Sequence, residues 1–321
     1  MFIIAETPVH AGSGSELGLV DLPIQRERHT DFPKIEASGL KGCIKEAFGI
    51  ANKEIELNAK KIRPKDKIKY IKDNAETELN KDYLSLVFGP EDSDEHASAI
   101  TFTDARILLF PVKSLKGIFA WITCPMVLER FSKEIKMAGI NSSNFGNFYT
   151  LQNTTPRQSN LAIESKIILE EFTFEVNEND ITSGIAEWFA NRIFPSDNAY
   201  NYWREKLKSD LVILSDDDFK QFVKTSTEVI TRTRIDDKTG TVASGALWTE
   251  EYLPQDTILY SLVMFTEPKV KSDEQKGIFK SVTPQEEAEL VAKFFKDGLP
   301  EIVQIGGNQT IGKGFVRLKI L

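Results

Sequence analysis

Residues 10–48 read HAGSGSELGLVDLPIQRERHTDFPKIEASGLKGCIKEAF. The stretch holds two glycine-rich turns, an acid in a loop, a run of interleaved charges, a short strand at 32–37 and the start of a helix. Glycine costs backbone entropy, so it is favoured where a chain turns sharply or approaches a ligand closely. Interleaved charges in an irregular segment build no hydrophobic face. We therefore predict that this stretch contacts a phosphate-bearing ligand, and that the ligand is RNA.

Length and composition bound the class of protein. The 321 residues suffice for one large domain or two modest ones, and the 41% that are hydrophobic are ample for a core. Cys43 and Cys124 stand far apart without CxxC spacing, so we expect no disulfide framework, no zinc site, and a location in the reducing cytoplasm. No apolar run approaches the roughly 18 residues of a membrane span, so no membrane contact is expected.

The net charge of −8 argues against a nucleic-acid binder, because phosphate contacts come from Lys and Arg. Net charge does not say where the charge lies. Many of the acidic residues fall outside residues 10–48, namely in residues 91–95, 175–180, 216–218 and 286–289. A basic groove elsewhere on the surface is compatible with this distribution.

Strands and helices mix along the chain without a repeating βαβ period, which favours an α+β fold. Residues 50–98 are rich in Lys and Glu, and we predict a mainly helical insertion there. Residues 141–160 are polar and are the best linker candidate. Strands are expected at 2–5, 32–37, 99–112, 117–123, 167–176, 212–214, 257–265, 302–305 and 315–321, and helices at 38–48, 82–88, 125–137, 181–193, 199–207, 216–223 and 284–297.

Residues 226–254 read as a long β-hairpin. Two strand-like runs flank Asp-Asp-Lys-Thr-Gly, which is good turn chemistry. The hairpin carries Arg232, Arg234 and Lys238, and a narrow projecting element with basic side chains suits contact with a partner strand. The alternative is an ordinary sheet edge.

Two glycine-bearing segments are candidate anion sites. Residues 306–314 (GGNQTIGKG) nearly spell a P-loop, but Gly314 stands where the Ser or Thr should be, and a strand rather than a helix follows. We therefore exclude an NTPase and keep a phosphate cradle of backbone N–H groups. Residues 38–42 (SGLKG) start a helix, whose N-terminus favours anions. The alternatives are a tight loop without a ligand and a plain N-cap with an exposed lysine.

Asp21 is the candidate catalytic residue. A loop acid near Arg26, Arg28 and His29 could hold a divalent metal or orient a ribose 2′-hydroxyl. His10 could act as a general acid or base. From the residues alone, a surface Asp paired with an Arg and a structural His are the stronger readings. Glu250, Glu251 and Tyr252 at the base of the hairpin are candidate site residues on the same terms, and on their own they are equally weak candidates.

Taken together, these blocks resemble the backbone subunits of the Cmr complex, the type III-B CRISPR effector, in the RAMP superfamily. The resemblance rests on HAGSGSELGLVDLPIQRERHTDFPKIEASGLKG at 10–42, and it is supported by three further blocks. The first block is long and specific, whereas the glycine loop is shared by many RAMP proteins. The supporting blocks are FGPEDSDEHASAITFTDARILLFPVKSLKG at 88–117, LWTEEYLP at 247–254 and IGGNQTIGKGFVRL at 305–318.

The resemblance implies a single RAMP domain over residues 1–321: a ferredoxin-like palm, modified from the RNA-recognition motif, with helical insertions and a β-hairpin thumb at 226–254. It implies a filament of copies along a CRISPR RNA, with other Cmr subunits and a single-stranded target RNA as partners. The target would be cut by metal-dependent 2′-hydroxyl attack, with Mg²⁺ or Mn²⁺ as the cofactor.

The resemblance also implies roles for individual residues. Asp21 takes the place of the essential cleavage acid and of a metal ligand. His10, Glu250 and Tyr252 fall near the cut site, with accessory roles at most. RNA contacts are expected at Arg26, Ser38, Gly39, Lys41, Gly42, Arg232, Arg234, Gly306, Gly307, Thr310, Gly312, Lys313 and Gly314.

Two other functions stay open. The first is a scaffold that binds CRISPR RNA without cutting, in which Asp21 serves packing. The second is a stand-alone enzyme that processes CRISPR precursor RNA. Such enzymes resemble a different RAMP branch and usually show a convincing histidine arrangement, which the three histidines here do not form.

Overall fold

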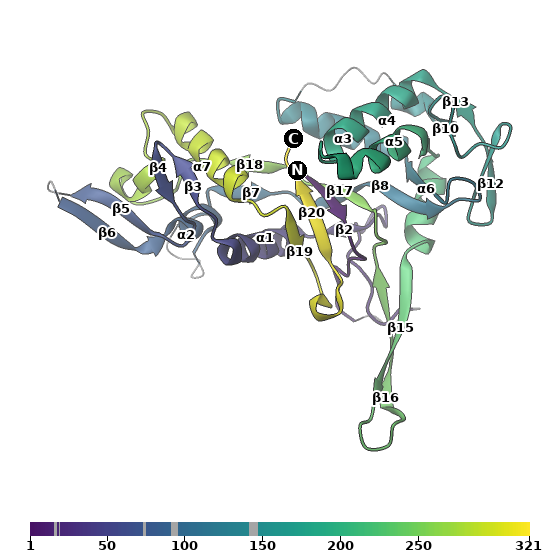
Figure 1. The fold of residues 1–321 in the computed structure, drawn as a ribbon, viewed down its shortest axis with the longest axis horizontal. Coiled ribbons are helices and arrows are strands. Elements are labelled where there is room, and N and C mark those ends of the chain that lie inside the picture. Colours follow the sequence, from purple (N-terminus) through teal and green to yellow (C-terminus); the bar gives the residue numbers. More distant parts are fainter. Residues whose placement is uncertain (16–17, 19, 73–74, 91–95, 141–146) are drawn as a thin grey trace.

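The computed structural model describes residues 1–15, 18, 20–72, 75–90, 96–140 and 147–321. Figure 1 shows a central sheet between two lobes, with a two-stranded hairpin projecting to one side. One lobe is built mainly from residues 52–88 and 273–298, and the other from residues 125–225. No helix within the described ranges is long and apolar enough to cross a lipid bilayer.

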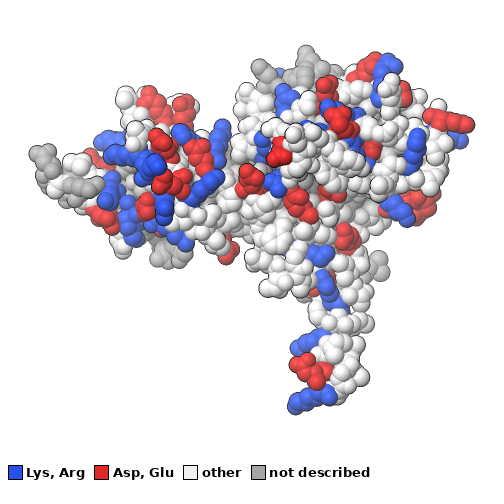
Figure 2. All heavy atoms as spheres, viewed as in Figure 1, with Lys and Arg blue, Asp and Glu red and all other residues white. Residues whose placement is uncertain are grey.

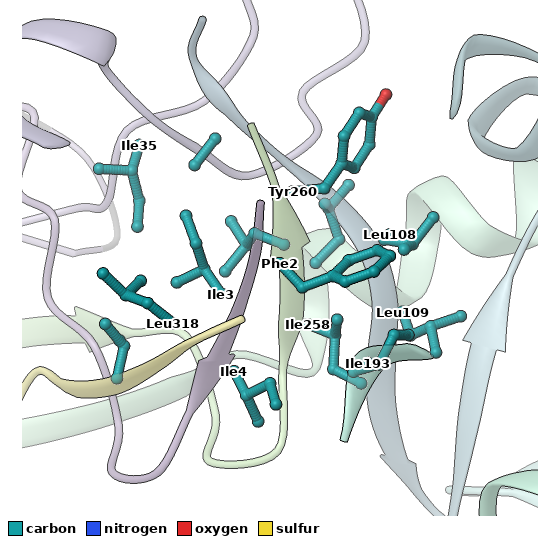
Figure 3. Close-up of a cluster of buried hydrophobic side chains, with 14 of the residues drawn as sticks. Phe2, Ile3, Ile4, Ile35, Leu108, Leu109, Ile193, Ile258, Tyr260 and Leu318 are labelled. Carbon is teal, nitrogen blue, oxygen red and sulfur yellow. The ribbon is translucent and has the colours of Figure 1, made fainter. Parts of the chain in front are cut away.

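Strand β1 (Phe2–Ala5) lies in the middle of the sheet, and all four of its residues are buried. A short continuous apolar run is typical of a strand that is covered on both faces. Strand β1 pairs antiparallel with β17 (Ile258–Tyr260) on one side and with β20 (Phe315–Lys319) on the other. Figure 3 shows Phe2 and Ile3 directed to opposite sides of β1, so both faces of the sheet contribute to the core.

The sheet extends on both sides of this centre, and it mixes antiparallel with parallel pairs. The predicted mixture of helices and strands without a βαβ repeat is confirmed at this level. Beyond β17 lie, in order, β8 (Ala105–Lys113), β9 (Phe119–Thr123), β14 (Leu211–Ile213), β10 (Thr154–Thr155) and β13 (Asn177–Glu178). On the other side β19 (Ile302–Gln304) borders β20, and β2 (Lys34–Ile35) pairs with β8. Strands β7 (Ile100–Phe102) and β18 (Val263–Phe265) form a separate two-stranded sheet.

The helices begin where local sequence signals place them. Pro125 opens its helix as predicted, and Thr283 forms a capping box with Glu286 at the start of another. The helices are α1 (Ala37–Ala51), α2 (Tyr83–Phe88), α3 (Pro125–Met137), α4 (Asp180–Ile193), α5 (Asn201–Ser209), α6 (Asp216–Thr225) and α7 (Pro284–Gly298), with 3-10 turns η1 (Phe148–Thr150), η2 (Asn198–Tyr200), η3 (Asp273–Phe279) and η4 (Gln309–Ile311).

The prediction of a mainly helical insertion over residues 50–98 is wrong. Two hairpins form most of its described part. Ile55 and Leu57 are buried while their neighbour is exposed, which is the period of a strand. Asn58 and Ala59 adopt left-handed backbone angles and close the first hairpin. The strands are β3 (Ile55–Leu57), β4 (Lys60–Ile62), β5 (Lys67–Lys72) and β6 (Ala75–Asp82).

The predicted N-cap at Ser38 is also wrong. Helix α1 begins at Ala37, and its N-cap Glu36 makes no side-chain capping bond. Instead the Ala37 N–H donates to Asp104 Oδ1 at 2.9 Å. A carboxylate from outside the helix therefore satisfies one of the free N–H groups that a local cap would otherwise take.

Two further predictions need correction. The strand expected over 167–176 is a tight hairpin of β11 (Lys166–Leu169) and β12 (Phe172–Glu175). The linker candidate at 141–160 is not a linker in its described part, because Thr154 and Thr155 are buried and pair into the main sheet. Residues 141–146 and the acidic run at 91–95 lie outside the described residues.

The long hairpin is confirmed as β15 (Glu228–Ile235) and β16 (Val242–Tyr252). At its tip the Asp236 carboxylate accepts hydrogen bonds from the backbone N–H groups of Lys238 and Thr239, which fixes the turn. Figure 1 shows the tip extending away from the rest of the protein, so the base of the hairpin is its attachment to the body.

Candidate functional site

Asp21 lies on a segment that runs along the base of the hairpin. The Leu22 N–H donates to Thr249 O at 3.0 Å, and the Glu251 N–H donates to Leu22 O at 3.0 Å. These two bonds form a parallel bridge between Leu22 and Glu250. The segment therefore acts as a short third strand beside β16, and backbone hydrogen bonds fix the position of the acid.

The Asp21 side chain is held by one residue, Thr249. Oδ2 of Asp21 accepts from the Thr249 N–H at 2.8 Å and from the Thr249 hydroxyl at 2.9 Å. The Asp21 N–H donates in return to Thr249 Oγ1 at 2.9 Å. The bonds from the Thr249 backbone and hydroxyl lower the pKa of Asp21, and the residue is exposed. The structure thus presents an ionised carboxylate to solvent in a fixed orientation.

The fit of Asp21 to a divalent metal can be judged from its surroundings. Within the described ranges no three His, Cys, Asp or Glu side chains are grouped to hold a metal. Mg²⁺ does not require such a group, because it is commonly bound by one or two carboxylates together with waters and phosphate oxygens. Oδ1 of Asp21 receives no hydrogen bond from another described residue, so it is available as such a ligand. Its role as a metal ligand stays a prediction.

Arg26, predicted to contact RNA, is engaged inside the protein. Its guanidinium lies 2.5 Å from Glu251 Oε1, and it also donates to Asp31 O at 2.8 Å and Val223 O at 2.9 Å. The side chain is only 19% exposed. Arg26 therefore serves as the counter-ion of a buried acid, and the structure gives no support to its predicted RNA contact.

Glu251, which the sequence marked only as a suggestive residue at the base of the hairpin, joins several segments. It is buried, and its carboxylate accepts from the Ile24 N–H at 3.0 Å and the Thr227 hydroxyl at 2.8 Å, besides Arg26. Its carbonyl lies 2.7 Å from Nδ1 of His10. A carbonyl only accepts, so Nδ1 of His10 carries a hydrogen and Nε2 is the nitrogen left for a ligand.

Glu250 and Tyr252 lie on the other face of the hairpin from Asp21. Successive side chains of a strand point to opposite faces, and Asp21 contacts the side chain of Thr249. The two predicted accessory residues therefore do not join Asp21 in one cluster. Tyr252 donates to Glu250, and Asn308 donates to Glu250 Oε2 at 2.9 Å and to the Tyr252 hydroxyl at 2.7 Å.

The ionisation of Glu250 and Tyr252 follows from their contacts. Burial alone would raise the pKa of Glu250, but hydrogen bonds from Tyr252, Trp248 and Arg232 outweigh it and lower the pKa. Burial and the bond to Glu250 raise the pKa of Tyr252. Arg232, predicted to contact RNA, donates to Glu250 Oε2 at 3.3 Å and to the Tyr252 hydroxyl at 3.2 Å. Arg234 is exposed further along the hairpin.

The glycine loop at 306–314 packs against His10. The Gly307 N–H donates to His10 O at 3.0 Å, and a Cβ atom on Gly306 would stand 2.1 Å from that oxygen. Lys313 Nζ lies 5.1 Å from the centre of the Tyr252 ring, and the His10 and Tyr252 rings are 5.4 Å apart. The structure therefore brings His10, Tyr252 and the loop together. Of the other loop residues, Thr310 and Gly312 are exposed, whereas Gly314 is buried.

The second predicted anion site lies at the start of α1. Ser38, Gly39 and Gly42 are exposed there, and Lys41 is half-buried. Burial and the neighbouring Lys45 lower the pKa of Lys41, and the first turn of α1 contains no acid. The turn thus combines a helix N-terminus with a cation and has no acid of its own. Helix α1 packs against β19, the strand that leads into the glycine loop (Figure 1).

Comparison with known families shows which family the chain belongs to. The sequence profile of the RAMP superfamily matches residues 2–317. The chain belongs to the RAMP superfamily. A RAMP relative, the CRISPR system Cmr endoribonuclease Cmr4 of Pyrococcus furiosus, is 38% identical over 321 residues, which cover 98% of this chain and 92% of the relative. The family resemblance predicted from the sequence is confirmed.

Solved RAMP structures share the fold. The crystal structure of oligomeric Cmr4 from Pyrococcus furiosus superposes with a TM-score of 0.63 at 30% identity and covers 98% of this chain and 95% of that one. A cryo-EM structure of the type III-B Cmr-beta complex bound to cognate target RNA contains a chain with a TM-score of 0.62 at 23% identity, covering 99% and 95%. At that identity the likeness concerns the fold alone.

We expect Thr249→Val in this RAMP protein to raise the pKa of Asp21, because the hydroxyl bond to Oδ2 is lost while the backbone bond remains. The pKa of Asp21 is lowered by folding, so its contribution to stability is present above the unfolded-state pKa and is lost as the pH falls through the folded-state pKa. The Val variant should lose that contribution at a higher pH. Carboxyl ¹³C NMR titration of Asp21 measures the shift.

Thr249→Ser is the matched control, because it keeps the hydroxyl oxygen that bonds Asp21. Its titration should follow that of the parent protein. If the Val and Ser variants titrate alike, the hydroxyl does not hold the carboxylate and the backbone N–H alone accounts for the lowered pKa.

We expect Gly306→Ala to destabilise this RAMP protein far more than Gly312→Ala. Both glycines have positive φ angles, +83° and +77°, which cost an alanine about 1–2 kcal/mol. Only Gly306 also faces a carbonyl oxygen at 2.1 Å, whereas a Cβ on Gly312 meets nothing within 4 Å. Urea unfolding should show a loss of roughly 3–5 kcal/mol for Gly306→Ala. Equal losses would mean that the loop is not locked against His10.

Proposed function

We propose that this protein is the backbone subunit of a type III-B CRISPR effector and cuts target RNA under the direction of a CRISPR RNA. The observation that carries the proposal is the exposed, ionised Asp21 carboxylate held by Thr249 at the base of the projecting hairpin. The relative named as the Cmr endoribonuclease Cmr4 matches 98% of the chain, including this region. Sequence specificity would come from base pairing, so the protein would read backbone and shape.

The proposed framework is a ferredoxin-like palm. Strands β20, β1, β17 and β8 lie side by side and are all antiparallel. Helix α1 follows β1 in the chain, and α7 follows β17. In chain order the four strands are β1, β8, β17 and β20, so their spatial order is 4-1-3-2. That strand order and the positions of the two helices support a ferredoxin-like palm within the mixed sheet.

The proposed chemistry is attack of a ribose 2′-hydroxyl on the adjacent phosphate. Asp21 can accept the hydroxyl proton or hold the hydroxyl in line, and the fixed hydrogen bonds to Thr249 limit its motion. Asp21 would also be the one protein ligand of a Mg²⁺ or Mn²⁺ ion. A bound divalent ion would supply charge neutralisation at the phosphate.

The two anion sites are proposed to hold the guide. The exposed backbone at Gly306 and the start of α1 at Ser38 and Gly39 would offer N–H groups to phosphates, whereas the N–H groups of Gly307 and Gly312 are donated to His10 O and Gln309 O. Lys41 and Lys313 add positive charge at these two places. The projecting hairpin, with Arg234 exposed, would act as the thumb that enters the guide–target duplex, and further copies of the chain and other Cmr subunits would complete the assembly.

A scaffold without cutting activity is the second candidate. It is favoured by the absence, among the residues the structure describes, of a group of three or more His, Cys, Asp or Glu side chains that could hold a metal. In that case Asp21 and Thr249 would only fasten the 20–24 segment to the hairpin.

We expect Asp21→Asn to abolish target cleavage in the assembled complex while leaving guide and target binding intact. Loss of a general base typically lowers a rate by about 10²–10⁴-fold, and the amide nearly preserves the size of the side chain. Cleavage with Mg²⁺ or Mn²⁺ is followed on labelled target RNA, and binding is followed by electrophoretic mobility. Asp217→Asn, which removes the same charge at an exposed position of α6, is the control and should cut normally.

An unchanged ladder of products from the Asp21→Asn complex would refute the catalytic assignment. The chain would then be the scaffold, and the nuclease would lie in another subunit. Loss of binding together with cutting would instead assign Asp21 to the architecture of the RNA site.

A further inference from the structure

The lobe that contains the two small hairpins carries a basic cavity that the proposed function does not use. The cavity has a volume of ≈ 910 Å³ and lies between β4, β5 and η3. Five of the side chains that line it are lysines and three are acids, so the lining carries a net charge of +2 in a chain of net charge −8. Figure 2 shows Lys and Arg on this lobe interspersed with Asp and Glu. The lysines are Lys60, Lys61, Lys67, Lys69 and Lys280.

The walls of the basic cavity are fixed by close packing. Turn η3 lies directly on β5 at Gly277, where an added Cβ atom would stand 2.7 Å from Ile68 Cγ2 and 3.6 Å from the Tyr83 ring. Gly277 has a φ of +57°, which favours glycine. Ile68 and Tyr83 are both buried. The lysines therefore stand on a rigid frame, although they come from three separate elements.

Part of the positive charge of the cavity is exposed to solvent. Lys61 pairs with Glu54 at 2.7 Å, and Asp66 accepts from the Arg63 N–H at 2.7 Å, so that acid is occupied in a turn. Lys60 and Lys280 are exposed, and neither lies within 4.0 Å of a carboxylate oxygen of any described residue, although the charge of Lys280 lowers the pKa of Asp273 and Glu274. A cavity whose lining carries a net positive charge attracts an anion.

The lining also has an aromatic and an apolar component. Tyr70 is half-buried and Ile71 is 64% exposed, and both residues line the cavity, with their side chains on opposite faces of β5. Lysines beside an accessible ring suit a single-stranded nucleic acid, because phosphates meet the cations while a base stacks on the ring. An acidic protein segment would satisfy the lysines but would leave Tyr70 without a stacking partner. The volume is in the range that holds a small organic ligand.

We infer that the basic cavity is a second RNA site, which binds a short single-stranded segment through its phosphates and without preference for base sequence. It is separate from the cleavage site, since none of its lining residues belongs to the hairpin, the glycine loop or the start of α1. The inference therefore stands whether or not Asp21 is catalytic.

The test is binding of a short oligouridine to the full chain carrying Lys60→Glu and Lys280→Glu. Both lysines are exposed, so folding should be unaffected. The control carries Lys133→Glu and Lys136→Glu on α3, which are also exposed and change the net charge equally. We expect the cavity variant to lose about tenfold in affinity and its salt slope to fall by about 1.4, while the control binds like the parent.

Photo-crosslinking locates the contact independently of affinity. Thiouridine-substituted RNA should crosslink to the peptide that contains Tyr70 in the parent chain, and Tyr70→Leu should remove that crosslink. Equal weakening in the cavity and control variants, or crosslinks only to the hairpin and glycine loop, would overturn the inference. Binding of polyglutamate that depends on Lys60 and Lys280, without binding of RNA, would also overturn it and assign the cavity to an acidic protein segment.

Discussion

The buried ion pair of Glu251 and Arg26 joins the irregular N-terminal stretch to the base of the hairpin. Glu251 is 5% exposed and also accepts hydrogen bonds from Ile24 and Thr227, so its charge is fully compensated. An uncompensated charge at such a position typically costs about 3–5 kcal/mol. Asp21 belongs to the segment that this pair holds in place. The position of the candidate cleavage acid therefore depends on two residues that need not touch a ligand.

Strand alternation divides the polar residues of β16 into two groups with different properties. On one face Thr249 holds Asp21, which is exposed and ionised, and this face can meet a substrate. On the other face Glu250 and Tyr252 are buried, and Asn308 connects them to the glycine loop. A polar network whose members are all hydrogen-bonded is rigid. A step of one residue along the strand thus separates a group suited to chemistry from a group that fastens two segments together.

The sequence predicted the elements whose signals are local. The hairpin followed from its turn residues, and the loop at 306–314 from its glycines. The insertion was misassigned because its Lys and Glu content resembles that of a solvated helix, while the alternation seen at Ile55 and Leu57 is too short to stand out. The internal partners of Arg26 were not foreseen because a guanidinium suits a phosphate and a buried carboxylate equally well. Thr249 was missed because its contact joins residues more than 200 positions apart.

The placement of β1 has a consequence for how the protein forms. Strand β1 pairs with β17 and β20, which lie more than 250 residues further along the chain. Beside it, the amino group of Met1 donates to Ser261 O across 260 residues. Contacts of such separation require closure of a long loop before they contribute stability, so they form slowly. During synthesis β1 remains an unpaired apolar segment until β17 and β20 have emerged. His10 and the glycine loop can meet only after residues 306–314 have been synthesised, so this part of the site forms long after His10 itself has been made.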